Sequence, residues 1–101
     1  MKLVTISSAR RFSLDKVQRS ELITQGAVRF ELLCFEAGQA DDQSGGGHTV
    51  YQVLEGEALV RIAGKTERLG KGKLLGTAAG EAHRIENAGG GLLVVLAASA
   101  G

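Results

Sequence analysis

Short apolar segments separated by glycines dominate the chain after residue 25. In residues 57–63, Ala58, Val60 and Ile62 occupy every second position, which places them on one face of a predicted strand. Residues 92–97 are apolar throughout, which is typical of a strand that is covered on both faces. Further strands are predicted at residues 28–35, 48–54, 66–69, 74–77 and 83–86.

The first 25 residues show a weaker pattern. Ser13 could cap a short helix that runs through Val17, or residues 16–22 could form an outer strand. We predict a turn and a strand in this part of the chain. Seven or more short strands without a long helical pattern indicate an all-β sandwich or barrel. Because 101 residues supply one hydrophobic core, we expect residues 1–101 to form a single domain.

The charge balance argues against a polyanionic partner. The chain carries 12 Lys and Arg residues against 11 Asp and Glu, a net charge of +1, so no strong field favours nucleic acid or an anionic membrane. The longest apolar run, residues 92–98, is far shorter than the ~20 residues of a membrane span. Cys34 has no partner for an internal disulfide, and we expect it to be a small buried residue. The first residues do not resemble a signal peptide, so we expect a cytoplasmic protein.

Two motifs resemble those of the cupin family. Residues 51–57, with the sequence YQVLEGE, resemble the strand and turn that close the first cupin motif, and residues 35–39 are similar to the turn that precedes it. The second motif, G(X)5PXG(X)2H(X)3N, is matched with alanine in place of proline, at Gly72, Gly80, His83 and Asn87. The resemblance covers residues 28–97. It implies a small single-domain cupin with the fold of a double-stranded β-helix, or jelly-roll barrel, preceded by a turn and an outer strand in residues 1–25.

The resemblance also implies where a metal ion would bind. Cupins commonly hold a divalent metal with two histidines and a Glu or Gln of the first motif, together with the histidine of the second. In this chain the first-motif positions fall on Gln43, Gly45 and Thr49, so only His83 remains as a standard ligand. A zinc or non-haem iron site needs about three protein ligands. The resemblance therefore implies a cupin with a degenerate first motif, and we expect no metal cofactor.

His48 leaves an alternative open. It lies one residue from the expected Glu position, and side chains alternate along a strand, so it should point away from the barrel. A bulge within residues 45–47 would shift the register and turn His48 toward His83. The two imidazoles, with an oxygen from residues 41–43, would then bind Fe, Mn, Ni or Zn in an enzyme of the oxygenase or isomerase type.

The interior of the barrel provides our first functional hypothesis, a small molecule bound in a mostly apolar cavity. The ligand-contacting residues that we predict are Thr49, Tyr51, His83 and Gln43. Within this set His83 is the candidate catalytic residue, because an imidazole acts as an acid or a base near neutral pH. The alternative roles are structural, with His83 bonded to the backbone and Tyr51 packed in the core.

The outward strand faces provide a further hypothesis, a structural dimerisation module. Val50, Leu54 and Leu59 fall on these faces, where exposed apolar side chains suit contact with a second copy of the chain. We therefore expect a homodimer as well as a small-molecule ligand.

Overall fold

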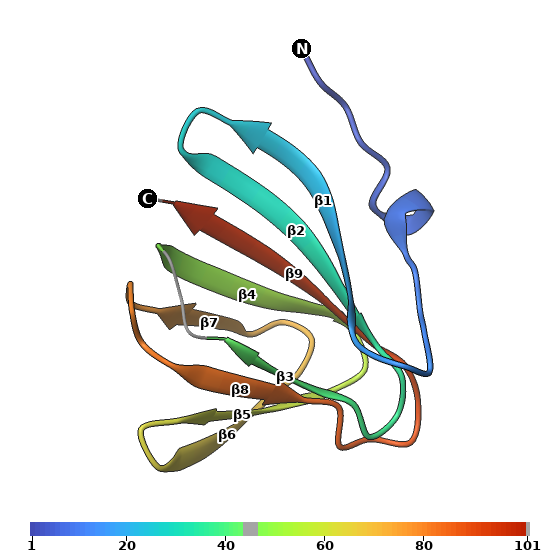
Figure 1. Ribbon diagram of the computed structural model, residues 1–101, viewed down its shortest axis with the longest axis vertical. Helices are drawn as coiled ribbons and strands as arrows, with labels where there is room; N and C mark the ends of the chain where they lie inside the picture. The colour runs from blue at the N-terminus through green and yellow to red at the C-terminus, as the bar shows by residue number, and fades with distance from the viewer. Residues whose placement is uncertain (44–46, 101) are drawn as a thin grey trace.

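Nine β-strands and one short 3-10 helix build the part of the chain that this computed structural model describes, residues 1–43 and 47–100 (Figure 1). The helix spans Ile6–Ala9. The strands are β1 (Gln18–Gln25), β2 (Val28–Phe35), β3 (Ala40–Gln43), β4 (His48–Glu55), β5 (Ala58–Ile62), β6 (Lys65–Leu69), β7 (Leu74–Thr77), β8 (His83–Glu86) and β9 (Leu93–Ala100).

The strands form two antiparallel sheets that pack face to face. One sheet has the order β1-β2-β9-β4-β7 and the other has the order β3-β8-β5-β6. Several neighbours within the sheets are distant in sequence; β9, for example, pairs with β2 on one side and with β4 on the other. This arrangement confirms the all-β jelly-roll fold predicted from the sequence.

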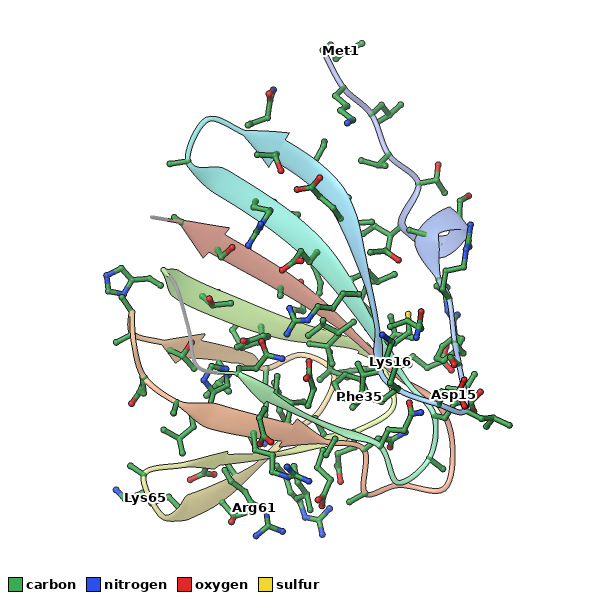
Figure 2. The ribbon with its side chains drawn as sticks, viewed as in Figure 1. Met1, Asp15, Lys16, Phe35, Arg61 and Lys65 are labelled. Atoms are coloured by element: carbon green, nitrogen blue, oxygen red, sulfur yellow. The ribbon has the colours of Figure 1, made fainter. Side chains whose placement is uncertain are left out.

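The main core lies between the two sheets and follows strand alternation. On β5, Ala58 and Val60 are buried while Arg61 is exposed, as the alternating pattern predicts. Phe35, at the end of β2, is fully buried in this core. Figure 2 shows Phe35 between the sheets, whereas Arg61 lies on the outer side of the β5–β6 hairpin and Lys65 lies at its tip.

A second apolar cluster covers the outer face of the five-stranded sheet. Leu22, Leu32, Cys34 and Val94 form its buried part, and Ala9 and Phe12 of the amino-terminal segment pack against it. β9 therefore has both faces covered, as its continuous apolar sequence predicts. The same burial raises the pKa of the Cys34 thiol, which keeps this buried cysteine protonated near neutral pH.

The amino-terminal part contains the predicted turn and strand. Ser13 caps no helix; its hydroxyl oxygen accepts a hydrogen bond from the Asp15 backbone N–H at 3.2 Å, which forms a local turn. β1 then begins at Gln18 and ends at Gln25, two and three residues later than the strand predicted at residues 16–22.

Asn87 holds two loops together at the end of β8 that lies away from His83. Its side chain is 1% exposed, and its amide N–H groups donate to three backbone carbonyl oxygens, those of Phe35 at 3.3 Å, Glu36 at 3.1 Å and Gly91 at 2.8 Å. The Asn87 Oδ1 atom accepts from Gly89 N–H at 3.3 Å. One side chain thereby satisfies backbone groups of the loop after β2 and the loop after β8.

Gly56 ends β4 where the chain passes very close to the start of β9. Its φ is +83°, and a Cβ atom built there would lie 2.4 Å from the Leu92 carbonyl oxygen. Only glycine meets both requirements without strain, which explains the glycine at this point of the YQVLEGE segment.

Candidate functional site

A cavity of about 350 Å³ opens between the two sheets and is lined by strands of both. Its walls are mainly polar: besides the predicted residues Gln43, Thr49, Tyr51 and His83, they include Arg19, Arg29, Glu31, Thr77 and Ser99. The prediction of a mostly apolar cavity is therefore wrong. The apolar side chains of the two sheets pack deeper in the barrel, and the strand ends around the cavity carry hydroxyl and charged groups.

Two cross-strand rows on the five-stranded sheet form one wall of the cavity. In the row nearer the strand ends, Arg29 pairs with Ser99, Ser99 with Thr49, and Thr49 with Thr77. In the next row, two residues further along each strand, Ala97 stands between Glu31 and Tyr51. Because side chains two apart on a strand share a face, both rows line the cavity.

Tyr51 and His83 meet across the barrel. Tyr51 is 2% exposed and His83 is 7% exposed, and the Tyr51 Oη atom lies 2.8 Å from the His83 Nε2 atom. The His83 Nδ1 atom lies 2.8 Å from the backbone oxygen of Glu81, which can only accept. Nδ1 therefore carries the proton of the neutral ring, and Nε2 accepts the proton donated by Tyr51.

Burial keeps the Tyr51 hydroxyl protonated. Removal from water is the largest influence and raises its pKa to about 12; the Arg19 guanidinium opposes the rise, while the Asp41 and Glu31 carboxylates add to it. With its proton directed to His83, the Tyr51 oxygen offers only lone pairs to the rest of the cavity.

A group of four polar side chains, which we call the Arg19 clasp, joins the edges of the two sheets. The clasp consists of Arg19, Glu31, Asp41 and Gln43. Arg19 on β1 donates to Asp41 Oδ2 on β3 at 2.9 Å, to Glu31 Oε1 at 3.4 Å and to Gln43 Oε1. The Gln43 amide in turn donates to Asp41. Gln43 lines the cavity, but both ends of its amide are already engaged within the clasp.

His48 lies on the outer face of β4 and is exposed. The pairing of β4 with β9 runs without a shift from His48 to Val53, so His48 and Thr49 alternate as an ordinary strand requires. The His48 Nδ1 atom accepts from the Ala79 backbone N–H at 3.1 Å. His48 therefore does not turn toward His83, as the alternative required, while residues 45 and 46, where the bulge was expected, lie outside the described residues.

The residues present do not fit the metal ion that this kind of motif commonly holds. Gln43 is engaged in the clasp, Thr49 offers a hydroxyl, and the Nε2 lone pair of His83 accepts from Tyr51. Gly45, the remaining first-motif position, lies outside the described residues. Across residues 1–43 and 47–100, no three His, Cys, Asp or Glu side chains gather as a metal site.

Sequence reasoning did not single out Arg19, Arg29, Thr77 or Ser99. Arg29 carries a weak signal, since it shares strand parity with Glu31 in an otherwise apolar strand. Ser99 and Thr77 reach the cavity only through the pairing of β9 and β7 with β4.

In the part of the chain that the structure describes, no helix is long and apolar enough to cross a membrane.

Comparisons with known proteins agree with this architecture. The family model for the cupin domain matches residues 32–99. Among solved structures, a protein from Thermus thermophilus superposes with a TM-score of 0.89 at 24% identity, covering 99% of this chain and 97% of that one. An RmlC-like cupin protein from Desulfovibrio desulfuricans gives a TM-score of 0.85 at 22% identity, covering 99% and 96%.

A cupin superfamily protein from Desulfitobacterium hafniense gives a TM-score of 0.80 at 23% identity, over 94% of this chain and 86% of that one. At these identities the likeness concerns the fold alone. No curated protein matches the chain.

Proposed function

This chain belongs to the cupin family, and from that premise we propose that its barrel binds a small polar molecule directly, without a metal ion. The hydrogen bond from Tyr51 to His83 carries the proposal. This bond occupies the lone pair of the His83 Nε2 atom, which a metal ion would need, and leaves the Tyr51 phenol oxygen facing the cavity. The barrel then acts as a binding module, in which hydroxyl, phenol and guanidinium groups recognise the ligand.

The size and the chemistry of the cavity support this function. About 350 Å³ lies within the range of small-molecule sites, at its lower end. The Thr49 hydroxyl makes a long hydrogen bond of 3.3 Å to the Gly47 carbonyl oxygen, which a ligand oxygen can replace. The metal-dependent oxygenase or isomerase lacks a comparable observation, because His83 is buried at the cavity while His48 is exposed on the outer face of β4.

Tyr51 provides the readout for a test. It is the only tyrosine, and the chain has no tryptophan, so tyrosine fluorescence reports on the cavity alone. A panel of small polar molecules should include compounds that change this emission and raise the melting temperature. If no member of a broad panel changes either signal, the proposal is wrong.

Two neighbouring residues give a matched pair of variants. Thr49→Val removes a cavity hydroxyl at nearly constant shape and should weaken binding by ~5- to 10-fold, the effect of one hydrogen bond. Val50→Thr adds a hydroxyl at the next position, on the outer face of β4, and should leave binding unchanged.

Elemental analysis of untagged protein tests the metal-free part of the proposal. We expect no stoichiometric transition metal. About one tightly held metal per chain that disappears in a His83→Ala variant would overturn it.

A homodimer and a cytoplasmic location stay predictions. Val50 is 44% exposed on the outer face of β4, whereas Leu54 and Leu59 are half-buried. Light scattering measures the oligomeric state, and a mass near the 10.5 kDa of one chain would exclude the dimer.

A further inference from the structure

The two arginines at the cavity have different surroundings. Arg19 contacts the carboxylates of Glu31 and Asp41 within the clasp. Arg29 lines the same cavity and makes no ion pair with any residue in the described ranges. Glu31 and Asp42 line the same cavity, but neither is paired with Arg29, which is exposed. A guanidinium has five N–H donors and no acceptor, so Arg29 presents a positive charge outside any ion pair and a fork of donors to whatever enters.

Hydroxyl groups continue from Arg29 along the same cross-strand row. Ser99 stands beside Arg29, and Thr49 follows on the next strand. The Ser99 hydroxyl lies 3.5 Å from the Arg29 carbonyl oxygen, which is longer than the ~2.5–3.0 Å of an ordinary O–H···O hydrogen bond. The backbones that carry these donors are neighbouring strands about 4.8 Å apart, so one carboxylate can reach the guanidinium and the nearest hydroxyl together.

The deeper row offers acceptors instead of donors. The Tyr51 proton is directed to His83, so the Tyr51 oxygen can only accept from a ligand. Glu31, one strand beyond Ala97 in the same row, is also an acceptor. Along β4 the two rows are separated by two residues, which is about 7 Å.

We propose that the cavity binds a small hydroxy acid, with the carboxylate at Arg29 and a hydroxyl group donating to Tyr51. The inference rests on the proposed function and adds the chemical class of the ligand. A carboxylate matches the donors of the outer row, and a hydroxyl at the other end of the molecule matches the acceptors of the inner row. A neutral polyol has no carboxylate for the donors of the outer row, and a simple fatty acid has no hydroxyl for the acceptors of the inner row.

Three probes of equal carbon chain length separate these matches: gluconate, sorbitol and hexanoate. Gluconate has both a carboxylate and hydroxyls, sorbitol has only hydroxyls, and hexanoate has only the carboxylate. Titration followed by Tyr51 fluorescence and by calorimetry should give an affinity for gluconate that is at least ~10-fold higher than for either other probe. The preference for gluconate over sorbitol should shrink as salt is added.

Arg29→Gln tests the assigned residue, with Arg61→Gln as the matched control. Arg61 is exposed on the outer side of β5, away from the cavity lining, so its variant makes the same charge change elsewhere (Figure 2). Arg29→Gln should lower the affinity for gluconate by ~10-fold and leave sorbitol within about 2-fold. Arg61→Gln should change neither. Circular dichroism establishes that both variants are folded.

The remaining outcomes show whether only the hydroxy-acid assignment is wrong or the proposed binding function is wrong as well. If sorbitol binds as tightly as gluconate, or if Arg29→Gln keeps the preference, the hydroxy-acid assignment is wrong and a binding cavity remains. The assignment is also wrong if other small molecules bind while none of the three probes does. If neither these probes nor the broad panel binds, both proposals fail.

Discussion

The Tyr51 hydroxyl donates to His83 Nε2 across 2.8 Å and so joins the five-stranded sheet to the four-stranded sheet. The bond lies where both side chains are almost fully removed from water. It has a structural role as well as the chemical one described above, and the two roles can be measured separately.

Removing the phenol hydroxyl should destabilise the fold. In Tyr51→Phe the buried Nε2 acceptor of His83 loses its partner, which should lower the free energy of unfolding by ~1–2 kcal/mol in urea denaturation. In a double-mutant cycle with His83→Leu, the two losses should not add, because each variant removes the same bond. Additive losses would show that the bond contributes nothing to stability.

Tyr51 should also make stability depend on alkaline pH. Its pKa is about 12 in the folded protein against a reference of 10.0, so between these values the folded state keeps a proton that the unfolded state has lost. The contribution is present below pH ~10 and is lost as the pH rises toward ~12, at up to ~1.4 kcal/mol per pH unit.

Tyr51→Phe is the control for this pH dependence, since lysines titrate in the same range in both proteins. Urea denaturation at several alkaline pH values should give a steeper fall for the wild type than for the variant. Because the chain has one tyrosine, tyrosinate absorbance follows the group directly. Equal slopes for the two proteins would contradict the raised pKa.

Substitutions at two glycines with a left-handed backbone conformation distinguish the stability cost of a steric clash from that of backbone strain. Gly56 has φ +83° and a Cβ position 2.4 Å from the Leu92 oxygen, whereas Gly64 has φ +78° and open space around it. Gly64→Ala should cost ~1 kcal/mol from the backbone alone, and Gly56→Ala should cost ~3 kcal/mol or more. Thermal and urea unfolding measure both. If the two variants lost similar amounts of stability, β9 would shift to accommodate the added methyl group at position 56 without cost.

Asn87 should be the most sensitive polar residue of the loops. Asn87→Ala leaves buried carbonyl oxygens after β2 and β8 without a donor and should cost ~2–4 kcal/mol in urea unfolding. Gln52→Ala, an exposed amide on the outer face of β4, should change stability by less than ~0.5 kcal/mol. A small effect of Asn87→Ala would mean that water replaces the amide at these carbonyls.

Strand parity made much of the cavity predictable from sequence. Once residues 48–54 are read as a strand, Thr49 and Tyr51 share one face and His48 takes the other, and the structure has this arrangement. The resemblance of the second motif to that of cupins likewise implied that His83 lies inside the barrel, where the structure has it buried. Only the first inference is local, since it needs nothing but the periodicity of an extended chain.

The partners of these residues were not predictable in the same way. That Tyr51 meets His83 depends on how closely the two sheets approach, and that Arg29 stands beside Ser99 depends on the register of β2 and β9. Residues 41–43 lie in β3 although aspartate has a low strand propensity, because their pairing with β8 outweighs that propensity.

The Arg19 clasp closes the barrel along a line where backbone pairing stops. β1 and β3 are edge strands of different sheets, and between them the clasp supplies side-chain contacts from a partly exposed arginine. Ionic contacts of this kind weaken as salt is added. The two sheets can therefore separate transiently along this line. Such a separation would widen the entrance of the cavity while the backbone hydrogen bonds within both sheets remain.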